Sequence, residues 1–416
     1  MSLQVSEIQI NSKRLREDLL ELSQIGKNPQ DHGVYRQAFT QADTDAKKWL
    51  IEKFAAFSCP AYIDGAGNVV ARLGDENTAS VAIGSHLDSV PRAGIFDGTL
   101  GVLAGLECAR IFHENRIPLK RPLEVIAFAD EEGRFGGMFG VEAICGNHNP
   151  DFLESTKDIK GIYLKDAMAS QGLPAMEALN ARRDPSSFHA FLELHIEQGP
   201  VLESKKIPIG IVEGISGIFK WVVRLIGRSG HAGTQPMDMR SDAFQGLADF
   251  AHEIYRIIDE DGSPYSRLTV GKVDLKPGFP HTIPGEAEFT LVGRDIKQEI
   301  MKELSLSCRK VLSAIARKHN LMFEYDELSW LEPRLCHDKI IGLLQKQAGK
   351  LGLEHHLMPS GAGHDTQFMS TLTPSGLIFV PSVAGISHAP DEWTHWDDVD
   401  KGANLLLQTA LHLCNE

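Results

Sequence analysis

The sequence predicts an α/β fold in which a sheet domain carries a smaller α+β domain as an insertion. Short apolar runs alternate with helical segments along most of the chain, and this alternation is typical of a sheet with helices on its faces. Between about residues 215 and 330 the pattern changes, and the earlier pattern resumes afterwards. The length of 416 residues also exceeds that of one ordinary core. We therefore expect one discontinuous domain, residues 1–214 and 331–416, and one inserted domain, residues 215–330.

The elements of the first domain follow from the spacing of its apolar residues. Leu15, Leu19 and Leu22 recur at helical spacing, and residues 49–54 begin a second helical face. Residues 101–113 form another helical segment. Strands are expected at the short apolar runs 81–84, 123–129, 191–194 and 377–380. Together these elements predict an open sheet with helices packed on its faces.

The inserted domain is predicted as strand, helix, strand, strand, helix and strand. The expected ranges are 220–226, 241–258, 266–275, 286–293, 298–319 and 321–326. This order is that of a ferredoxin-like domain.

Composition excludes two classes of partner. The net charge is 42 − 56 = −14, and no run of Lys and Arg is dense enough to neutralise phosphates, so we expect no nucleic acid partner. No apolar stretch approaches the roughly 18 residues of a membrane span, and the polar start, residues 1–13, lacks the core of a signal peptide. We therefore expect a cytoplasmic protein that does not enter a membrane.

Acidic and imidazole side chains follow the predicted strands of the first domain, in short loops that contain glycine. Because ligands gather beyond the carboxyl ends of strands in open α/β sheets, these side chains are expected to converge. Each one alone is more often an ordinary loop residue. Their joint occurrence predicts a site for two divalent metal ions. The candidate ligands are His86, Asp97, Glu132, His195 and His388.

The residue types indicate the metals and the chemistry. Neutral imidazole and carboxylate are ligands that Zn²⁺ favours, and Mn²⁺ and Co²⁺ accept similar sets. Asp97, followed by Gly98, is predicted to bridge the two ions, and the Asp88 carboxylate is predicted to orient the imidazole of His86. Glu131 precedes a candidate ligand and could take a proton from water. Metal-assisted hydrolysis is the reaction that this pattern favours.

At these residues the sequence resembles the family of N-carbamoyl-L-amino acid hydrolases, allantoate amidohydrolases and ureidopropionases, within the clan of dinuclear-zinc aminopeptidases. The matching segments run through nearly the whole chain. They include Gly84-Ser85-His86-Leu87-Asp88, Glu131-Glu132-Gly133, His195-Ile196-Glu197-Gln198-Gly199-Pro200, Gly230-His231-Ala232-Gly233, Ser360-Gly361-Ala362-Gly363-His364-Asp365 and Ile386-Ser387-His388.

The resemblance implies a zinc-aminopeptidase-like catalytic domain with a ferredoxin-like lid or dimerisation domain. One metal would be held by His86 and His195, the other by Glu132 and His388, with Asp97 between them. Glu131 would be the general base. The reaction would cleave the carbamoyl C–N bond of an N-carbamoyl-L-amino acid or of allantoate and release ammonia and carbon dioxide.

The resemblance also implies how the substrate, a small ureido compound with a carboxylate, is held. Gln198 would contact it, Arg294 would grip its carboxylate, and His231 would stabilise the oxyanion, often across the interface of a homodimer. His281 stands where relatives usually have an asparagine. Arg134 also follows Gly133 directly, one residue earlier than in relatives, so we expect an altered substrate pocket beside an intact metal site.

Two alternatives remain open from the sequence. A dinuclear metallopeptidase or aminoacylase of the same clan would act on N-acyl amino acids or dipeptides, but most clan peptidases carry a carboxylate where this chain has His195. A non-catalytic metal-binding protein is the second alternative, and the presence of Glu131 argues against it.

Overall fold

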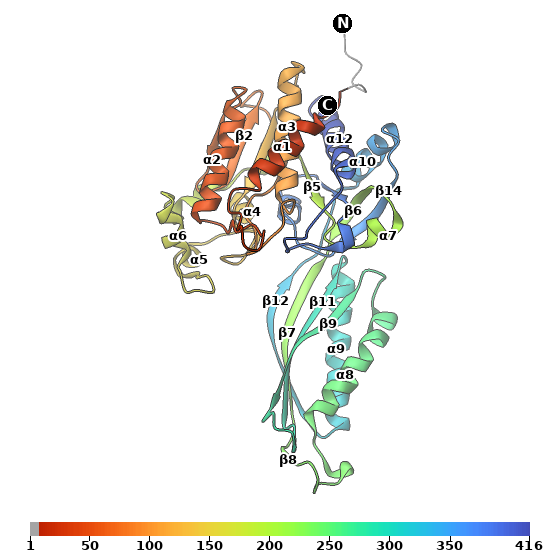
Figure 1. Ribbon diagram of the computed structural model, residues 1–416. Coiled ribbons are helices and arrows are strands. Elements are labelled where there is room, and N and C mark those ends of the chain that lie inside the picture. The colour runs from red at the N-terminus through yellow and green to blue at the C-terminus, as the bar shows by residue number, and fades with distance from the viewer. Residues whose placement is uncertain (1–7) are drawn as a thin grey trace. The chain divides into compact units, whose positions relative to one another are not determined.

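A computed structural model describes residues 8–416. The chain forms two compact units, of which the first comprises the chain up to Glu213 and again from Cys336 to Glu416, and the second comprises Gly214–Leu335 (Figure 1). The predicted fold class, a mixed α/β sheet with a separate antiparallel domain, is confirmed. The predicted polar start, residues 1–13, lies partly outside the described residues.

The first unit is built on a nine-stranded mixed sheet. Its strands are β1 (Ala61–Ile63), β2 (Val69–Leu73), β3 (Ser80–His86), β4 (Leu123–Phe128), β5 (Phe188–Ile196), β6 (Ile209–Ile215), β13 (Arg334–Leu335), β14 (His355–Ser360) and β15 (Ser375–Val380). They run in the order β1-β2-β4-β3-β5-β15-β6-β13, and β14 pairs with β6. The four neighbours β4, β3, β5 and β15 are parallel, so their carboxyl ends meet at one edge.

Helices cover both faces of this sheet. They are α1 (Ser12–Leu22), α2 (Gln41–Ala55), α3 (Thr99–Glu114), α4 (Phe139–Cys145), α5 (Pro150–Ser155), α6 (Leu164–Ser170), α7 (Val201–Lys205), α10 (Asp338–Lys350), α11 (Asp365–Met369) and α12 (Trp396–Leu413). Alternate strand residues point to opposite faces: Ile83 packs in the core with α1, α3 and α12, and Ala82 packs with α4 and α11. No helix within residues 8–416 is long and apolar enough to cross a membrane.

Two of the candidate ligands lie inside strands rather than in the loops that follow them. His86 is the last residue of β3 and pairs with Phe128, and His195 lies opposite Phe379 near the end of β5. The prediction of loops was wrong here because strand pairing continues through both histidines. Pairing with one buried neighbouring strand, β4 for His86 and β15 for His195, therefore fixes the position of each imidazole.

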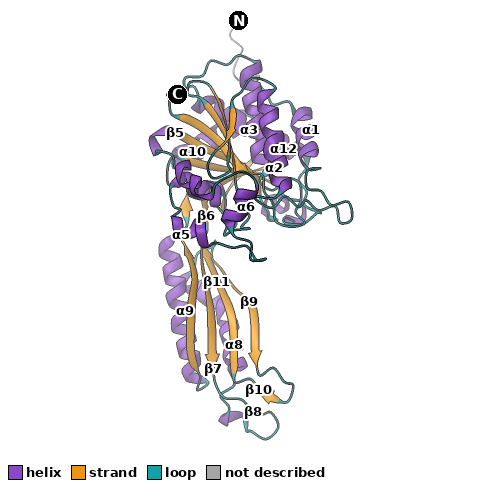
Figure 2. Cartoon of the chain, turned by 90° about the vertical axis from the view of Figure 1, so that its left-hand side faces the viewer, coloured by secondary structure: helices purple, strands orange, loops and turns teal. Residues whose placement is uncertain are grey.

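The second unit is an antiparallel sheet with two helices packed on one face. Its elements are β7 (Gly217–Ile226), β8 (Gly230–His231), α8 (Ala243–Asp261), β9 (Arg267–Lys276), β10 (Thr282–Ile283), β11 (Glu286–Asp295), α9 (Gln298–Lys318) and β12 (Met322–Leu331). The strand order is β12-β7-β11-β9, as in a ferredoxin-like domain. Figure 2 shows these four long strands side by side, with β8 and β10 beyond one end of them. Alternate residues of β7, such as Trp221 and Val223, pack under the helices.

Candidate metal centre

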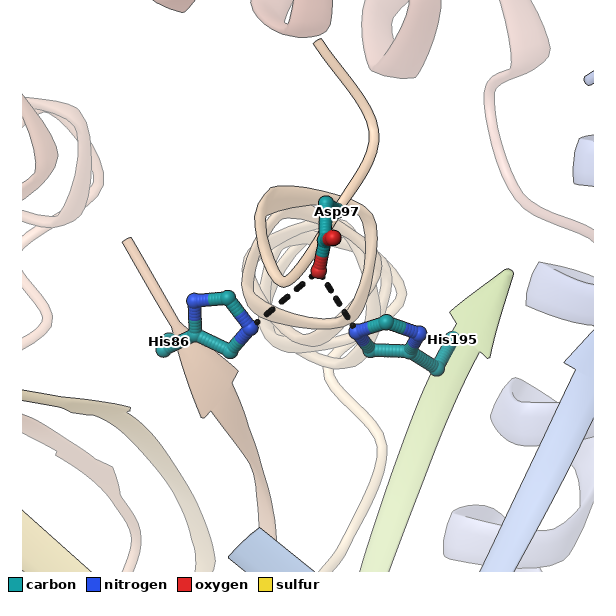
Figure 3. A group of neighbouring side chains, drawn as sticks. All are labelled: His86, Asp97 and His195. Atoms are coloured by element: carbon teal, nitrogen blue, oxygen red, sulfur yellow. Dashed lines mark ion pairs between the residues drawn. The ribbon is translucent and has the colours of Figure 1, made fainter. Parts of the chain in front are cut away.

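Three side chains from different elements converge at the ends of β3 and β5. Asp97 lies two residues before Thr99, the first residue of α3, and its Oδ1 lies 3.4 Å from Nε2 of His86 and 3.2 Å from Nε2 of His195 (Figure 3). All three residues are buried. Both imidazoles thus aim the same ring nitrogen at one carboxylate oxygen.

The other oxygen of Asp97 faces a second group. Its Oδ2 lies 3.2 Å from Nε2 of His388, and that nitrogen is 3.4 Å from Oε2 of Glu132. The structure therefore brings together all five predicted ligands, with Asp97 shared between two sets of donors.

The distances fit a pair of metal ions. Ligands about 2.0–2.2 Å from a tetrahedral Zn²⁺ are separated by roughly 3.4 Å, whereas charge-assisted hydrogen bonds are about 2.7–2.9 Å long. The contacts around Asp97 measure 3.2–3.4 Å. In addition, Oε1 of Glu132 is buried and has no hydrogen-bond partner among the described residues. The spacing of these donors therefore fits ligands around metal ions.

The orientation of the imidazoles supports the same conclusion. Nδ1 of His86 donates to the carbonyl oxygen of Asp88 at 3.0 Å, and Nδ1 of His195 donates to that of Ile196 at 2.8 Å. These bonds leave the Nε2 lone pairs directed at the centre, and the Gly98 amide donates to Nε2 of His195 at 3.1 Å. The Nε2 atoms of both rings therefore face the Asp97 carboxylate, an orientation that suits metal ligands.

The electrostatics of the centre favour positive charge. Burial acts to lower the pKa of His86, but the carboxylates of Glu131, Asp97 and Asp88 outweigh it and raise the pKa well above its usual value. The hydrogen bond with Asp97 raises the pKa of His388 to about 9. Burial, followed by repulsion from Asp97, raises the pKa of Glu132 to about 7. These shifts indicate an excess of negative charge that divalent ions would neutralise.

Glu131 lies beside the centre without joining either set around Asp97. Its Oε2 is 3.6 Å from Nε2 of His86. Burial raises the pKa of this carboxyl group well above its usual value, and Glu132 adds to the effect. Its position and its affinity for a proton suit a group that exchanges protons with a reactant at the centre.

Asp88 does not act as predicted. Its carboxylate was expected to orient the imidazole of His86, but its backbone carbonyl does so instead. The carboxylate oxygens accept hydrogen bonds from the amides of Glu131 and Glu132, each at 3.2 Å. Two residues after His86 the chain has turned, so the side chain points at the neighbouring loop. Asp88 thereby holds the two glutamates in place.

Glu392 and Ser387 were missed by the sequence interpretation. The Glu392 carboxylate accepts hydrogen bonds from the amides of Phe96 and Asp97 at 2.9 and 3.1 Å. Ser387 donates to Glu392 at 2.9 Å and contacts Oδ2 of Asp97 at 3.0 Å. The only available signal was that Glu392 is four residues after His388. These contacts tie the loop of Asp97 to the loop of His388.

A second missed group lies behind His195. The ring of His364 packs edge-on against that of His195, with centroids 4.5 Å apart. Nε2 of His364 and both carboxylate oxygens of Asp365 are buried without a hydrogen-bond partner among the described residues. Burial raises the pKa of Asp365 well above its usual value. The segment 360–365 was noticed as a motif, but it gave no indication of these contacts.

Gln198 reaches the centre itself. Its amide Nε2 lies 2.8 Å from Oδ2 of Asp97 and 3.2 Å from Oγ of Ser387. Gln198 and His388 have φ angles of 57° and 54°, in the left-handed region that residues other than glycine rarely adopt. Such backbone strain is concentrated at functional sites.

The predicted substrate residues of the second unit fall into two separate places. His231 pairs with Thr282, and the carbonyl oxygen of His281 accepts a hydrogen bond from Ala232, so the two histidines lie together beyond the Ile226 end of β7. Arg294 pairs with Ile218 at the opposite end of the strands. Burial lowers the pKa of Arg294. One copy of this unit therefore cannot bring His231 and Arg294 to the same small molecule.

Substitution of Gly98 tests the position of His86 in the metal centre. A Cβ at this position would lie 2.4 Å from the ring of His86, and φ is +66°. We expect Gly98→Ala to displace the imidazole and to weaken metal binding by about 10- to 100-fold. Metal bound per chain is measured by mass spectrometry. Gly172→Ala is the matched control, because φ is +77° there and nothing lies within 4 Å. Equal metal affinity in both variants would contradict the placement of His86.

Comparison with known proteins identifies relatives over almost the full length. The model of peptidase family M20/M25/M40 matches residues 82–412. The N-carbamoyl-L-amino-acid amidohydrolase of Paenarthrobacter aurescens is 36% identical over 403 residues, which cover 95% of this chain and 97% of that protein. The allantoate amidohydrolase of Escherichia coli (strain K12) is 34% identical over 398 residues, covering 94% and 95%.

A solved structure also matches almost the whole chain. The crystal structure of an amidase of the hydantoinase/carbamoylase family from Burkholderia multivorans has a TM-score of 0.92 and 31% sequence identity. The match covers 98% of this chain and 99% of that chain.

Proposed function

The chain belongs to peptidase family M20/M25/M40, within its hydantoinase/carbamoylase branch, and from this premise we propose that it hydrolyses the carbamoyl C–N bond of an N-carbamoyl-L-amino acid or of allantoate. It is an amidohydrolase that acts on C–N bonds other than peptide bonds. The products are the free amine and a carbamate, which decays to ammonia and carbon dioxide.

One observation carries the proposal: the Asp97 carboxylate is shared between two sets of donors, with Glu131 beside them. His86 and His195 would hold one divalent ion, Glu132 and His388 the other, and Asp97 both. We propose Zn²⁺, with Mn²⁺ and Co²⁺ as ions that the same donors accept. When bound, such a pair polarises the ureido carbonyl and makes water more acidic.

Glu131 is proposed as the general base. Its carboxylate accepts a proton from the attacking water as the oxygen adds to the ureido carbon. It returns that proton to the nitrogen of the leaving amine as the C–N bond breaks, so the carboxylate is regenerated in each cycle. The high proton affinity that burial gives this group suits both steps.

The remaining predicted residues are proposed to hold the substrate. Arg294 would bind its carboxylate through two parallel hydrogen bonds. His231 would donate to the oxyanion, Gln198 would contact the ureido group, and His281 would line the same place as His231. Because His231 and Arg294 lie at opposite ends of one sheet, a site that uses both requires a second copy of the chain, and we propose a homodimer.

The test is a substrate panel with metal-loaded protein. Initial rates are measured for N-carbamoyl-L-amino acids, N-carbamoyl-β-alanine and allantoate, and for N-acetyl amino acids and dipeptides. We expect ammonia from a ureido compound and slower amine release from the N-acyl compounds. Activity confined to the N-acetyl or peptide substrates would refute the proposal and assign the chain to aminoacylase or peptidase chemistry.

A further inference from the structure

A cavity of about 500 Å³ opens beside the metal centre. Glu132 and Asp88 line it on the side of the centre, and its other walls come from the segments 35–40, 89–91, 133–134 and 158–162. All of these residues belong to the first unit. Cavities that bind small molecules measure about 300–1,000 Å³, so this one accepts a group the size of an amino acid side chain.

Most of the polar side chains in its walls are already bonded within the protein. The Tyr35 hydroxyl donates to Asp31 at 2.6 Å, and the Thr40 hydroxyl donates to the carbonyl oxygen of Gln37 at 2.7 Å. Ser89 Oγ accepts a hydrogen bond from the amide of Arg36 at 3.1 Å, and Lys160 and the Gln37 amide contribute further polar groups. A ligand in the cavity therefore meets chiefly the Tyr35 ring, Val90, Pro91, Ile159 and Ile162.

The wall that carries the two isoleucines is held by Arg134 and Asp158. Asp158 accepts hydrogen bonds from the amides of Lys160 and Ile162 at 2.9 and 3.0 Å, which closes a tight turn. Arg134 donates to Asp158 at 3.2 Å and to the carbonyl oxygen of Ala38 at 2.6 Å, so it links two segments that line the cavity. Arg134, which directly follows Gly133, thereby helps to shape the cavity.

The turn presents apolar side chains that the described chain does not cover. Ile159 is fully exposed and Ile162 is 41% exposed, although both line the cavity. Exposed apolar side chains that group around a groove are typical of ligand-binding surfaces. Glu132, a proposed metal ligand, lines the same cavity, so the cavity adjoins the metal centre.

We propose that this cavity binds the apolar side chain of an N-carbamoyl-α-amino acid, with Ile159 and Ile162 as the residues that select it. The inference rests on the proposed function and narrows its substrate class. Allantoate carries a second polar ureido group, and N-carbamoyl-β-alanine carries no side chain. Neither compound would gain binding affinity from the apolar walls of the cavity.

The test compares kcat/KM of the metal-loaded full-length protein for N-carbamoyl-L-leucine, N-carbamoylglycine and allantoate. Since one buried methylene group changes specificity by about 10-fold or more, we expect the leucine derivative to exceed the glycine derivative by about 10- to 100-fold. Ile162→Ser and Ile159→Ser should remove most of this ratio by lowering kcat/KM for the leucine derivative. Both positions are at the surface, so thermal unfolding should be unaffected.

Leu20→Ser is the matched control, because Leu20 is also 41% exposed and belongs to α1, away from the cavity. A leucine-to-glycine ratio near one in the parent, a preference for allantoate, or an equal loss in the control would overturn the inference while the proposed function stands. If the parent hydrolysed no ureido compound, the proposed function and this inference would both be refuted.

Discussion

Replacing Glu131 with glutamine is expected to reduce kcat by about 10²- to 10⁴-fold while the bound metal is retained. The amide keeps the shape of the side chain but cannot accept a proton. The proposed ligands are untouched, because Asp97 and not Glu131 joins the two sets of donors. The measurement is kcat together with metal per chain, determined on the same preparation.

Glu142→Gln is the control for this experiment. Glu142 is a half-buried glutamate of α4, and burial raises the pKa of its carboxyl group to about 7. It has no place in the metal centre, so its variant should keep the parent rate. A Glu131→Gln variant that kept the parent rate, or that lost its metal, would refute the assignment of Glu131 as a base.

The second large effect is expected at His231. Loss of one oxyanion donor costs about 10²- to 10³-fold in kcat. We therefore expect His231→Ala to lower kcat by that factor and to leave the metal content unchanged. The separation of His231 from Arg294 along the sheet also predicts which copy of the chain supplies each residue. Glu286, beside the His231 end, and Arg294 are 294 − 286 = 8 residues apart on β11, which corresponds to roughly 26 Å along a strand. We therefore expect His231 and Arg294 at any one site to come from different copies.

Mixing two inactive variants tests this expectation. In a dimer of His231→Ala with Glu131→Gln, one site combines an intact metal centre with an intact His231 from the partner. Statistical exchange should then restore about a quarter of the parent activity. A mixture of Glu131→Gln with Asp97→Asn is the control, because each site keeps one lesion in its own centre. No recovery in the first mixture would show that His231 serves its own chain.

Much of the fold could be predicted because burial imposes simple periods. Alternate residues of β7 are buried, and the central strands of the first unit are buried throughout, so both appear in the sequence as recognisable runs. The five predicted ligands converge because they stand at the carboxyl ends of parallel strands or in the loops beside them. The ends of β3 and β5 were misjudged because pairing depends on the neighbouring strand and not on local composition.

The hydrogen bonds around the centre could not be predicted. Asp88 and Glu392 both hold the backbone of a distant loop, and Glu392 is 295 residues from Asp97. The direction of such a side chain depends on how the backbone turns after the strand, which residue type does not specify. The separation of His231 from Arg294 likewise required the strand register of the second unit.

A metal titration tests the central claim most directly. Metal-free protein is supplied with Zn²⁺, Mn²⁺ or Co²⁺, and bound metal per chain is measured together with ammonia release from N-carbamoyl-L-leucine. We expect about two ions per chain in the parent and activity that rises as they bind, and we expect Asp97→Ala to lose both the bound metal and the activity. Full activity without metal, or an Asp97→Ala variant that still binds two ions and turns over substrate, would contradict it.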